Sequence, residues 1–260
     1  MKRAVFNQKG GVGKTSIACN LAAAMAKLGK KTLVIDLDSQ ANSSQYLLGT
    51  RIAEVSKTIT EFFESSLSSF KLLSENLSDI VYKTDFPNLY VIPASLGLAE
   101  LQPKLESRYK IFKLQQAVDA LIASDGFQEV LIDTPPALNF YSMSALITAD
   151  KVVVPFDCDT FSANALEHVM NIVDEVIADH RPNLSVEGII INHFQSQAKL
   201  PTDAISALRA KGYPILEPFL STSIAMRESH AVNIPLPFLK PKHKLSMEFL
   251  KLAKNLRSDI

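Results

Sequence analysis

The sequence has few cysteines, no long apolar run and no net charge. Its two cysteines, Cys19 and Cys158, lie far apart and show no metal-ligand spacing, so neither a disulfide framework nor a cysteine metal site is expected. No run approaches the roughly 20 apolar residues that a membrane-spanning helix needs. The N-terminus enters a strand pattern directly, without a signal peptide. These absences indicate a cytosolic protein with two buried, reduced thiols.

The charge cancels over the whole chain but is unevenly distributed. The 27 basic and 27 acidic residues give no global reason to expect a nucleic-acid partner. From Ile190 onward, however, ten Lys or Arg face five Asp or Glu, a balance of +5, so the first 189 residues carry −5. The C-terminal region is therefore a candidate partner-facing surface. The size of 260 residues and the 47% hydrophobic content predict a single globular domain over residues 1–260.

The most informative stretch is a glycine-rich loop between a strand pattern (residues 4–6) and a helical pattern that starts near Thr15. It reads Lys9-Gly10-Gly11-Val12-Gly13-Lys14-Thr15-Ser16. Glycines let successive backbone N–H groups turn toward an anion, and the helix start adds unpaired N–H groups and a positive dipole end. Lys14 can reach β- and γ-phosphates, and the Thr15 hydroxyl can ligate Mg²⁺. The segment is therefore a candidate phosphate-binding loop.

The loop resembles the deviant Walker A loop of the ParA/MinD family of ATPases. The strict P-loop pattern wants glycine at position 8, where this chain has Gln8, but Lys9 adds a second lysine. The resemblance implies that Lys14 acts on the nucleotide of its own subunit, while Lys9 reaches the partner's nucleotide across a dimer interface. It implies ATP and Mg²⁺ as cofactors, nucleotide contacts from all eight loop residues, and catalytic roles for Lys9 and Lys14.

Acidic residues follow two buried strand patterns. Asp36 and Asp38 stand on the same side at the end of strand 31–36, and Asp133 ends strand 129–133. The carboxyl ends of parallel strands are where ligands bind, so these carboxylates suggest handling of Mg²⁺ and water. The segments Asp36–Gln40 and Asp133–Pro136 resemble acidic motifs of the same family, with Ser39 in place of a usual proline. The resemblance implies that Asp38 activates the attacking water and that Asp36 and Asp133 support the Mg²⁺ shell.

Strand and helix patterns alternate along the chain. Further strands are expected at residues 89–93, 151–156, 186–192 and 214–216, and helices at 109–122, 161–177, around Ile205 and Leu208, and at 245–256. Residues 56–77 are expected to form short helices or a surface insertion. This order predicts an α/β fold with a doubly wound, mostly parallel sheet flanked by helices, and the resemblance makes it a P-loop NTPase.

Two more positions follow from the resemblance. Asn192, after strand 186–192, matches an asparagine that contacts adenine, and an amide suits a base edge because it both donates and accepts hydrogen bonds. A plain strand-end turn remains the alternative for this residue. Pro218 opens the loop where the family places backbone contacts to the base. His168 and His180 have no partner at ligand spacing and are expected to be solvated or packed.

The C-terminal helix pattern carries a basic set. Leu245, Phe249, Leu252 and Leu256 form its apolar stripe. The basic face is either solvated or binds DNA phosphates, and the family resemblance favours the second interpretation, with salt-sensitive and sequence-independent binding. The candidate DNA contacts are Arg209, Lys211, Lys240, Lys242, Lys244, Lys251 and Lys254.

The resemblance implies a ParA-like cycle in the cytoplasm, on the nucleoid. ATP would drive a sandwich homodimer onto non-specific DNA, and hydrolysis, stimulated by a ParB-like or adaptor protein, would release it and position a cargo. A MinD-like membrane ATPase is one alternative, but the amphipathic tail lacks a separating linker, so a membrane partner is not expected. A P-loop amide ligase is another, although no second substrate pocket is visible in the sequence. An iron–sulfur reductase would need other cysteines, and a tyrosine kinase would need tyrosines after Tyr213.

Overall fold

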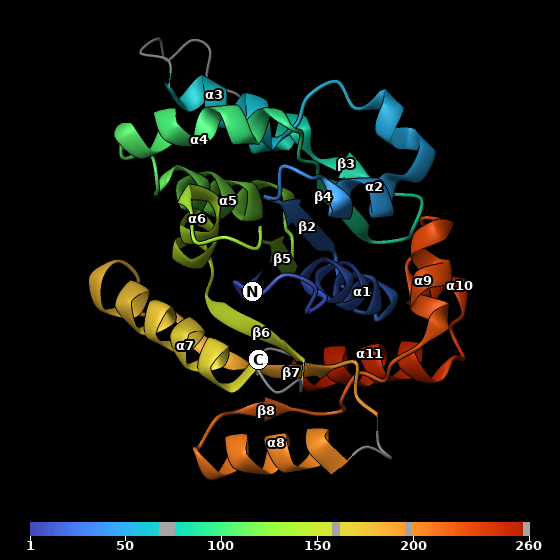
Figure 1. Ribbon diagram of the computed structural model, residues 1–260. Helices are drawn as coiled ribbons and strands as arrows, with labels where there is room; N and C mark the ends of the chain where they lie inside the picture. The colour runs from blue at the N-terminus through green and yellow to red at the C-terminus, as the bar shows by residue number, and fades with distance from the viewer. Residues whose placement is uncertain (68–75, 158–161, 196–198, 257–260) are drawn as a thin grey trace.

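The computed structural model describes residues 1–260 except 68–75, 158–161, 196–198 and 257–260. Eight strands form one sheet in the order β3-β4-β2-β5-β1-β6-β7-β8, and every described pairing is parallel except that of β3 with β4 (Figure 1). The strands are β1 (Lys2–Val5), β2 (Thr32–Asp36), β3 (Tyr82–Lys83), β4 (Leu89–Ile92), β5 (Glu129–Asp133), β6 (Lys151–Asp157), β7 (Ser185–Asn192) and β8 (Ile215–Leu216).

Helices cover both faces of the sheet, as the doubly wound pattern predicted. One face carries α1 (Lys14–Lys27), α2 (Asn42–Leu48), α9 (Ile224–Ala231), α10 (Leu236–Leu239) and α11 (Lys244–Asn255). The other carries α3 (Ile59–Leu67), α4 (Gly97–Ser107), α5 (Lys113–Asp125), α6 (Phe140–Thr148), α7 (Ser162–Asp179) and α8 (Lys199–Ala210). Two 3₁₀ helices, η1 (Gly49–Glu54) and η3 (Leu77–Ile80), complete the described elements. No helix among the described residues is long and apolar enough to span a bilayer.

The central strands are buried on both faces, which explains their continuous apolar sequences. Every residue of β1, β2 and β5 is buried. Their register pairs Val5 with Asp133 and Asp133 with Asp36. The carboxyl ends of β1, β2 and β5 therefore lie side by side, and the segments that follow them meet at one edge of the sheet.

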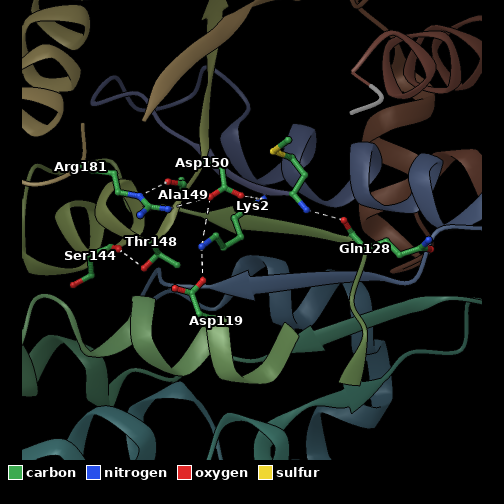
Figure 2. Close-up of polar contacts among 9 residues, drawn as sticks. Lys2, Asp119, Gln128, Ser144, Thr148, Ala149, Asp150 and Arg181 are labelled. Carbon is green, nitrogen blue, oxygen red and sulfur yellow. Dashed lines mark hydrogen bonds and ion pairs between the residues drawn. The ribbon is translucent and has the colours of Figure 1, made fainter. Parts of the chain in front are cut away.

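The opposite, amino-terminal edge is closed by a cluster of ion pairs (Figure 2). The Lys2 ammonium lies 2.5 Å from Asp119 of α5 and 3.5 Å from Asp150, which precedes β6. Asp150 also accepts a hydrogen bond from the Lys2 backbone N–H at 2.9 Å and pairs with Arg181 at 3.1 Å. This cluster joins β1, β6, α5 and the end of α7, far from the edge where the glycine loop begins.

A second ion-pair network lies inside the molecule. The fully buried guanidinium of Arg3 pairs with Glu187 of β7 at 2.6 Å and with Glu129 of β5. It also donates a hydrogen bond to the Leu256 carbonyl, directly after α11. One side chain of the central strand therefore holds two other strands and the end of the C-terminal helix.

The predicted helix at residues 109–122 is wrong at its start. The helix α5 begins at Lys113 and continues to Asp125, because Tyr109 has a φ of 53° and ends the preceding segment. Phe112, expected in the core, precedes the helix and is 41% exposed, whereas Leu121 is buried as expected. The apolar spacing that predicted the helix continues across this boundary.

The remaining helix and histidine expectations fit the described residues. The described part of residues 56–77 contains α3, and η3 begins at Leu77, as expected for short helices. His168 and His180 are exposed, and the His180 ring lies against the Phe112 ring with centroids 6.0 Å apart. The thiol of Cys158 lies outside the described residues, and Cys19 is a buried free cysteine.

Candidate active site

The glycine loop joins β1 to α1 in a conformation that requires glycine. Gly11 and Gly13 have φ values of 80° and 90°, which favour glycine, and a Cβ on Gly13 would lie 2.4 Å from the Asn192 amide nitrogen. The Asn7 side chain accepts a hydrogen bond from Lys9 N at 2.9 Å and donates one to a β6 carbonyl at 2.7 Å. The loop is thereby fixed to the sheet before any ligand binds. The other predicted loop residues, Gly10, Val12, Thr15 and Ser16, lie in the same turn or in the first turn of α1.

Lys14 spans its own loop. Its ammonium donates a hydrogen bond to the Lys9 carbonyl at 3.0 Å, and its side chain is mostly buried. Burial lowers the pKa of Lys14, while the charges of Asp133 and Asp38 oppose that shift. A desolvated ammonium beside inward-turned N–H groups is suited to an anion of high charge, such as a polyphosphate. Lys9 is half-buried at the rim of the loop.

Asp36 is held by Ser44 of α2. Its carboxylate accepts hydrogen bonds from Ser44 N at 2.9 Å, from Ser44 Oγ at 2.7 Å and from Asp38 N at 3.1 Å. The side chain is fully buried. Burial, together with the charge of Asp133, raises the pKa of Asp36 to about 7. Ser44 thus partly compensates for a carboxylate that the interior would otherwise keep protonated.

Asp133 is held by the preceding serine, Ser43. The Ser43 hydroxyl donates to one carboxylate oxygen at 2.7 Å and accepts a weak hydrogen bond from the Cys19 thiol at 3.2 Å. Burial raises the pKa of Asp133 to about 6, against the effect of Ser43 and of the nearby Thr15 hydroxyl. The second oxygen, Oδ1, makes no hydrogen bond of ordinary geometry with the described residues. Within the part of the chain that the structure describes, this buried oxygen is therefore left to a ligand or water.

Asp38 differs from both buried acids because it is half-exposed. One of its carboxylate oxygens accepts a hydrogen bond from Gln40 N at 3.0 Å, which fixes the side chain at the start of a turn. It lies near enough to Lys14 and Asp133 to affect the pKa of each. A fixed, accessible carboxylate beside a phosphate site is suited to orient an attacking water.

The residues present fit a magnesium ion with a nucleotide. The Thr15 hydroxyl and the unpaired Asp133 Oδ1 supply oxygen atoms at the base of the loop, and Asp36 lies beside them in the strand register. Mg²⁺ prefers oxygen ligands, keeps several waters and binds through few protein groups plus phosphates. No group of three or more His, Cys, Asp or Glu suited to a metal occurs among the described residues. The bound ion would supply charge stabilisation at the phosphates, while Lys14 and Asp38 bind and orient.

Asn192 lies under the loop. Its amide donates to the Val12 carbonyl at 2.9 Å, so β7 supports the loop from below. It also lines a cavity of about 120 Å³ together with Ser16, Ser221 and Arg227 among others. Pro218 follows a cis peptide bond after β8 and is not among the described residues that line this cavity. The adenine contacts of Asn192 and Pro218 remain predictions.

The residues predicted to bind DNA are not gathered on a single helix. Arg209 and Lys211 lie at the end of α8, and the other five lie around α11, on the opposite face of the sheet at its β8 edge (Figure 1). The two groups approach each other at Glu217: its side chain pairs with Arg209, and its backbone carbonyl accepts a hydrogen bond from the Asn255 side-chain amide. Lys240 pairs with Glu228, and Lys244 lies 3.8 Å from Glu248. All six lysines of the set, Lys211, Lys240, Lys242, Lys244, Lys251 and Lys254, are exposed.

Sequence reasoning missed the side chains that hold the site together. Asn7, Ser43 and Ser44 lie within a few residues of the recognised motifs, but each acts through a partner brought close only by the sheet. The signal that could have found the two serines is their place in the first turn of α2, a few residues after the strand-end acids. No local pattern connects Ser16 to His230, 214 residues later.

Comparisons with known proteins identify the family of this chain. A family model described as an AAA domain matches residues 2–186. The chromosome partitioning protein ParA of Caulobacter vibrioides is 30% identical over 257 residues, covering 98% of this chain and 93% of the relative.

Solved structures with nucleotide share the fold. The ATP complex of Cyanothece McdA(D38A) has a TM-score of 0.83 at 26% identity, covering 100% of this chain and 98% of that one. Cobyrinic acid a,c-diamide synthase from Mycobacterium smegmatis, with ADP and magnesium, has a TM-score of 0.81 at 24% identity, covering 98% and 92%. The second likeness concerns the fold alone. The chain belongs to the family of ParA/MinD-like partition ATPases and hydrolyses ATP.

Proposed function

We propose that ATP brings two copies of this chain together in a sandwich dimer that binds DNA without sequence preference. Hydrolysis, stimulated by a ParB-like or adaptor protein, then releases the dimer and positions a cargo on the nucleoid. The observation that carries the proposal is the open rim of the site. Lys9 and Asp38 are half-exposed there, whereas Lys14, Asp36 and Asp133 are buried.

The open rim matters because hydrolysis needs a controlled, water-poor site. This chain supplies the floor of the site, from β1, β2, β5 and the loop, but its own residues leave Asp38 accessible. A second copy facing the same edge would exclude bulk water and bring its Lys9 to the nucleotide. Catalysis then consists of positioning and charge stabilisation: lysines at the phosphates and Asp38 at the water.

The geometry of α11 counts against the membrane alternative. Its apolar stripe, Leu245, Phe249, Leu252 and Leu256, is buried against the face that carries α1. Release onto a lipid surface would expose that stripe and remove the Leu256 carbonyl from the buried Arg3 guanidinium. The basic side chains of α11 remain exposed without any such change.

The test is binding to random-sequence duplex DNA, with ATP and with ADP, across a salt series, with anionic liposomes in parallel. We expect DNA binding that depends on ATP and weakens steeply with salt. The K251Q/K254Q variant should reduce the slope of log affinity against log salt by about 0.9 for each DNA phosphate that the two lysines neutralise. The matched control K104Q/K113Q removes two exposed lysines on α4 and α5 and should leave the slope unchanged.

Two outcomes would contradict the proposal. Liposome binding without DNA binding would assign the protein to the membrane class. Equal slopes of log affinity against log salt for K251Q/K254Q and K104Q/K113Q would show that Lys251 and Lys254 do not contact DNA.

A further inference from the structure

One imidazole joins the phosphate loop to a helix near the C-terminal end of the fold. Ser16, in the first turn of α1, has its hydroxyl 2.9 Å from Nε2 of His230 on α9. The His230 ring stacks on Tyr46 of α2, with centroids 4.1 Å apart and planes at 19°. His230 of α9 therefore contacts the last residue of the phosphate loop, in the first turn of α1, and one further helix, α2.

The ring is held in place by a buried polar frame around it. The Tyr46 hydroxyl contacts Ser229 and donates to the Asn20 side-chain oxygen at 3.3 Å. The same Asn20 oxygen accepts from Leu236 N at 2.7 Å, and the Asn20 amide donates to the Ser16 carbonyl at 2.8 Å. Because this frame fixes Tyr46 and the start of α10, it leaves Nε2 of the stacked ring aimed at the Ser16 hydroxyl.

The ring is not simply filling the core. His230 is half-buried, and with Tyr46 it lines a cavity of about 370 Å³ that also touches Thr15, Asn42 and Gln45. Burial lowers the pKa of His230, so the ring is neutral near pH 7 and carries one N–H donor. Because the His230 ring is neutral, it acts on the Ser16 hydroxyl through a hydrogen bond rather than through charge.

The chemistry of a hydroxyl explains what that bond would do. Ser16 stands two residues after Lys14 at the N-terminus of α1, where N–H and O–H groups face an anion. A hydroxyl can accept one hydrogen bond while donating another. If His230 Nε2–H donates to the Ser16 oxygen, the Ser16 proton is left free and directed to a phosphate oxygen.

We propose that His230 is a positioning residue for nucleotide binding: its Nε2–H bond orients the Ser16 hydroxyl toward a bound phosphate. By linkage, a nucleotide on the loop then stabilises the docking of α9 to the same degree. The inference depends on nucleotide binding by the family and is independent of the proposed DNA and dimer steps.

Two substitutions separate the hydrogen bond from the stack. His230→Phe keeps an aromatic ring on Tyr46 but removes the donor, whereas His230→Gln keeps an N–H donor near Nε2 but removes the ring. The affinities for fluorescent ATP and ADP analogues are measured with Mg²⁺, together with the Tm of each protein. We expect His230→Phe to weaken both affinities roughly three- to tenfold, the effect of one hydrogen bond, and His230→Gln to retain them within about twofold.

The double variant Ser16→Ala/His230→Phe tests whether the two residues act together, even if one of the single variants is less stable. If His230 acts through the hydroxyl, Ser16→Ala loses the same factor as His230→Phe, and the combination loses no more than either alone. Amide exchange in α9 should also slow on ADP binding in the unaltered protein but not in His230→Phe.

Three results would overturn the inference. Additive losses in the double variant would show that the two residues act separately. Retained affinity in Ser16→Ala would show that the hydroxyl does not matter, and retained affinity in His230→Phe with loss in His230→Gln would show that the ring only packs.

Discussion

Two carboxyl groups buried in one site cannot both be charged without compensation, and here each has its own serine. Ser44 donates to Asp36 and Ser43 donates to Asp133, yet burial still raises their pKa values to about 7 and about 6. At neutral pH, a proton is therefore held in part within the site. A cation there would favour the charged forms and displace that proton.

The first prediction concerns the pH dependence of stability without nucleotide. Burial raises the pKa values of Asp36 and Asp133 to about 7 and about 6 in the folded protein, against about 3.9 in the unfolded chain. Between pH of about 4 and 7 the folded state therefore binds more protons than the unfolded state. The free energy of unfolding should therefore fall as the pH rises from about 4 to 7. Urea unfolding at several pH values measures this free energy for the unaltered protein and for Asp36→Asn. The free energy of unfolding of Asp36→Asn should decrease less over this pH range, because the variant lacks the Asp36 carboxyl. Parallel profiles for the two proteins would contradict it.

The second prediction separates binding from turnover with two single substitutions. Lys14→Ala removes the ammonium that crosses the loop and should abolish nucleotide binding. Asp38→Ala leaves the loop and both buried acids in place, so it should bind ATP but not turn it over. Titration with a fluorescent ATP analogue and phosphate release measure the two steps. Normal ATP hydrolysis by Asp38→Ala would show that Asp38 does not orient the attacking water.

The residues with chemical roles were easier to predict than those that hold them. Asp36, Asp38 and Asp133 end strand patterns, and strand ends meet because parallel register is regular. The serine partners of Asp36 and Asp133 depend on how α2 lies at the ends of β2 and β5, which no local pattern encodes. His230 could not be found from the sequence because it reaches the loop through a hydrogen bond between residues 214 positions apart.

At the scale of elements, α11 is positioned by its apolar stripe and by Arg3. The stripe was predicted from helical spacing and is buried. The polar half of the arrangement, Arg3 with Glu129, Glu187 and the Leu256 carbonyl, was not, because it joins residues up to 253 positions apart. The start of α5 was predicted too early for a local reason. The backbone breaks at Tyr109, although the apolar pattern that predicted the helix continues across it.

The third prediction is that Arg3→Met destabilises the protein strongly. Removing the guanidinium leaves two carboxylates and a carbonyl without their partner in the interior, which costs about 3–5 kcal/mol. Denaturant unfolding of Arg3→Met should show this loss. The control Arg51→Met breaks ion pairs with the exposed side chains of Glu54 and Asp85, which solvent screens, and should change stability far less than Arg3→Met. Equal effects of the two substitutions would show that the buried network is not special.

At the scale of the whole molecule, the two edges of the sheet are built for different purposes. Ion pairs among Lys2, Asp119, Asp150 and Arg181 close the amino edge, as Figure 2 shows. The carboxyl edge carries the loop, the acids and a half-exposed rim. The doubly wound arrangement was predictable from the alternation of elements, since each crossover must return to the same edge of the sheet.

The fourth prediction is that Lys9→Ala binds ATP but stays monomeric. In the proposed dimer, Lys9 acts on the partner's nucleotide, so its removal should spare the cis site built on Lys14. Sedimentation with a slowly hydrolysed ATP analogue measures the mass, with the exposed Lys104→Ala on α4 as the control. A full population of Lys9→Ala dimers would refute the trans role.

The Arg3 network also bears on how the chain is made. β1 precedes the other strands along the chain and is synthesised before them, yet the Arg3 guanidinium finds a further acceptor only at residue 256. Glu129 and Glu187 emerge at intermediate times, so the charge is compensated in stages as synthesis proceeds. The contacts of β1 are thus completed only when the chain beyond α11 has been made. A nascent chain that stalls before the end of α11 leaves the Arg3 guanidinium without the Leu256 carbonyl.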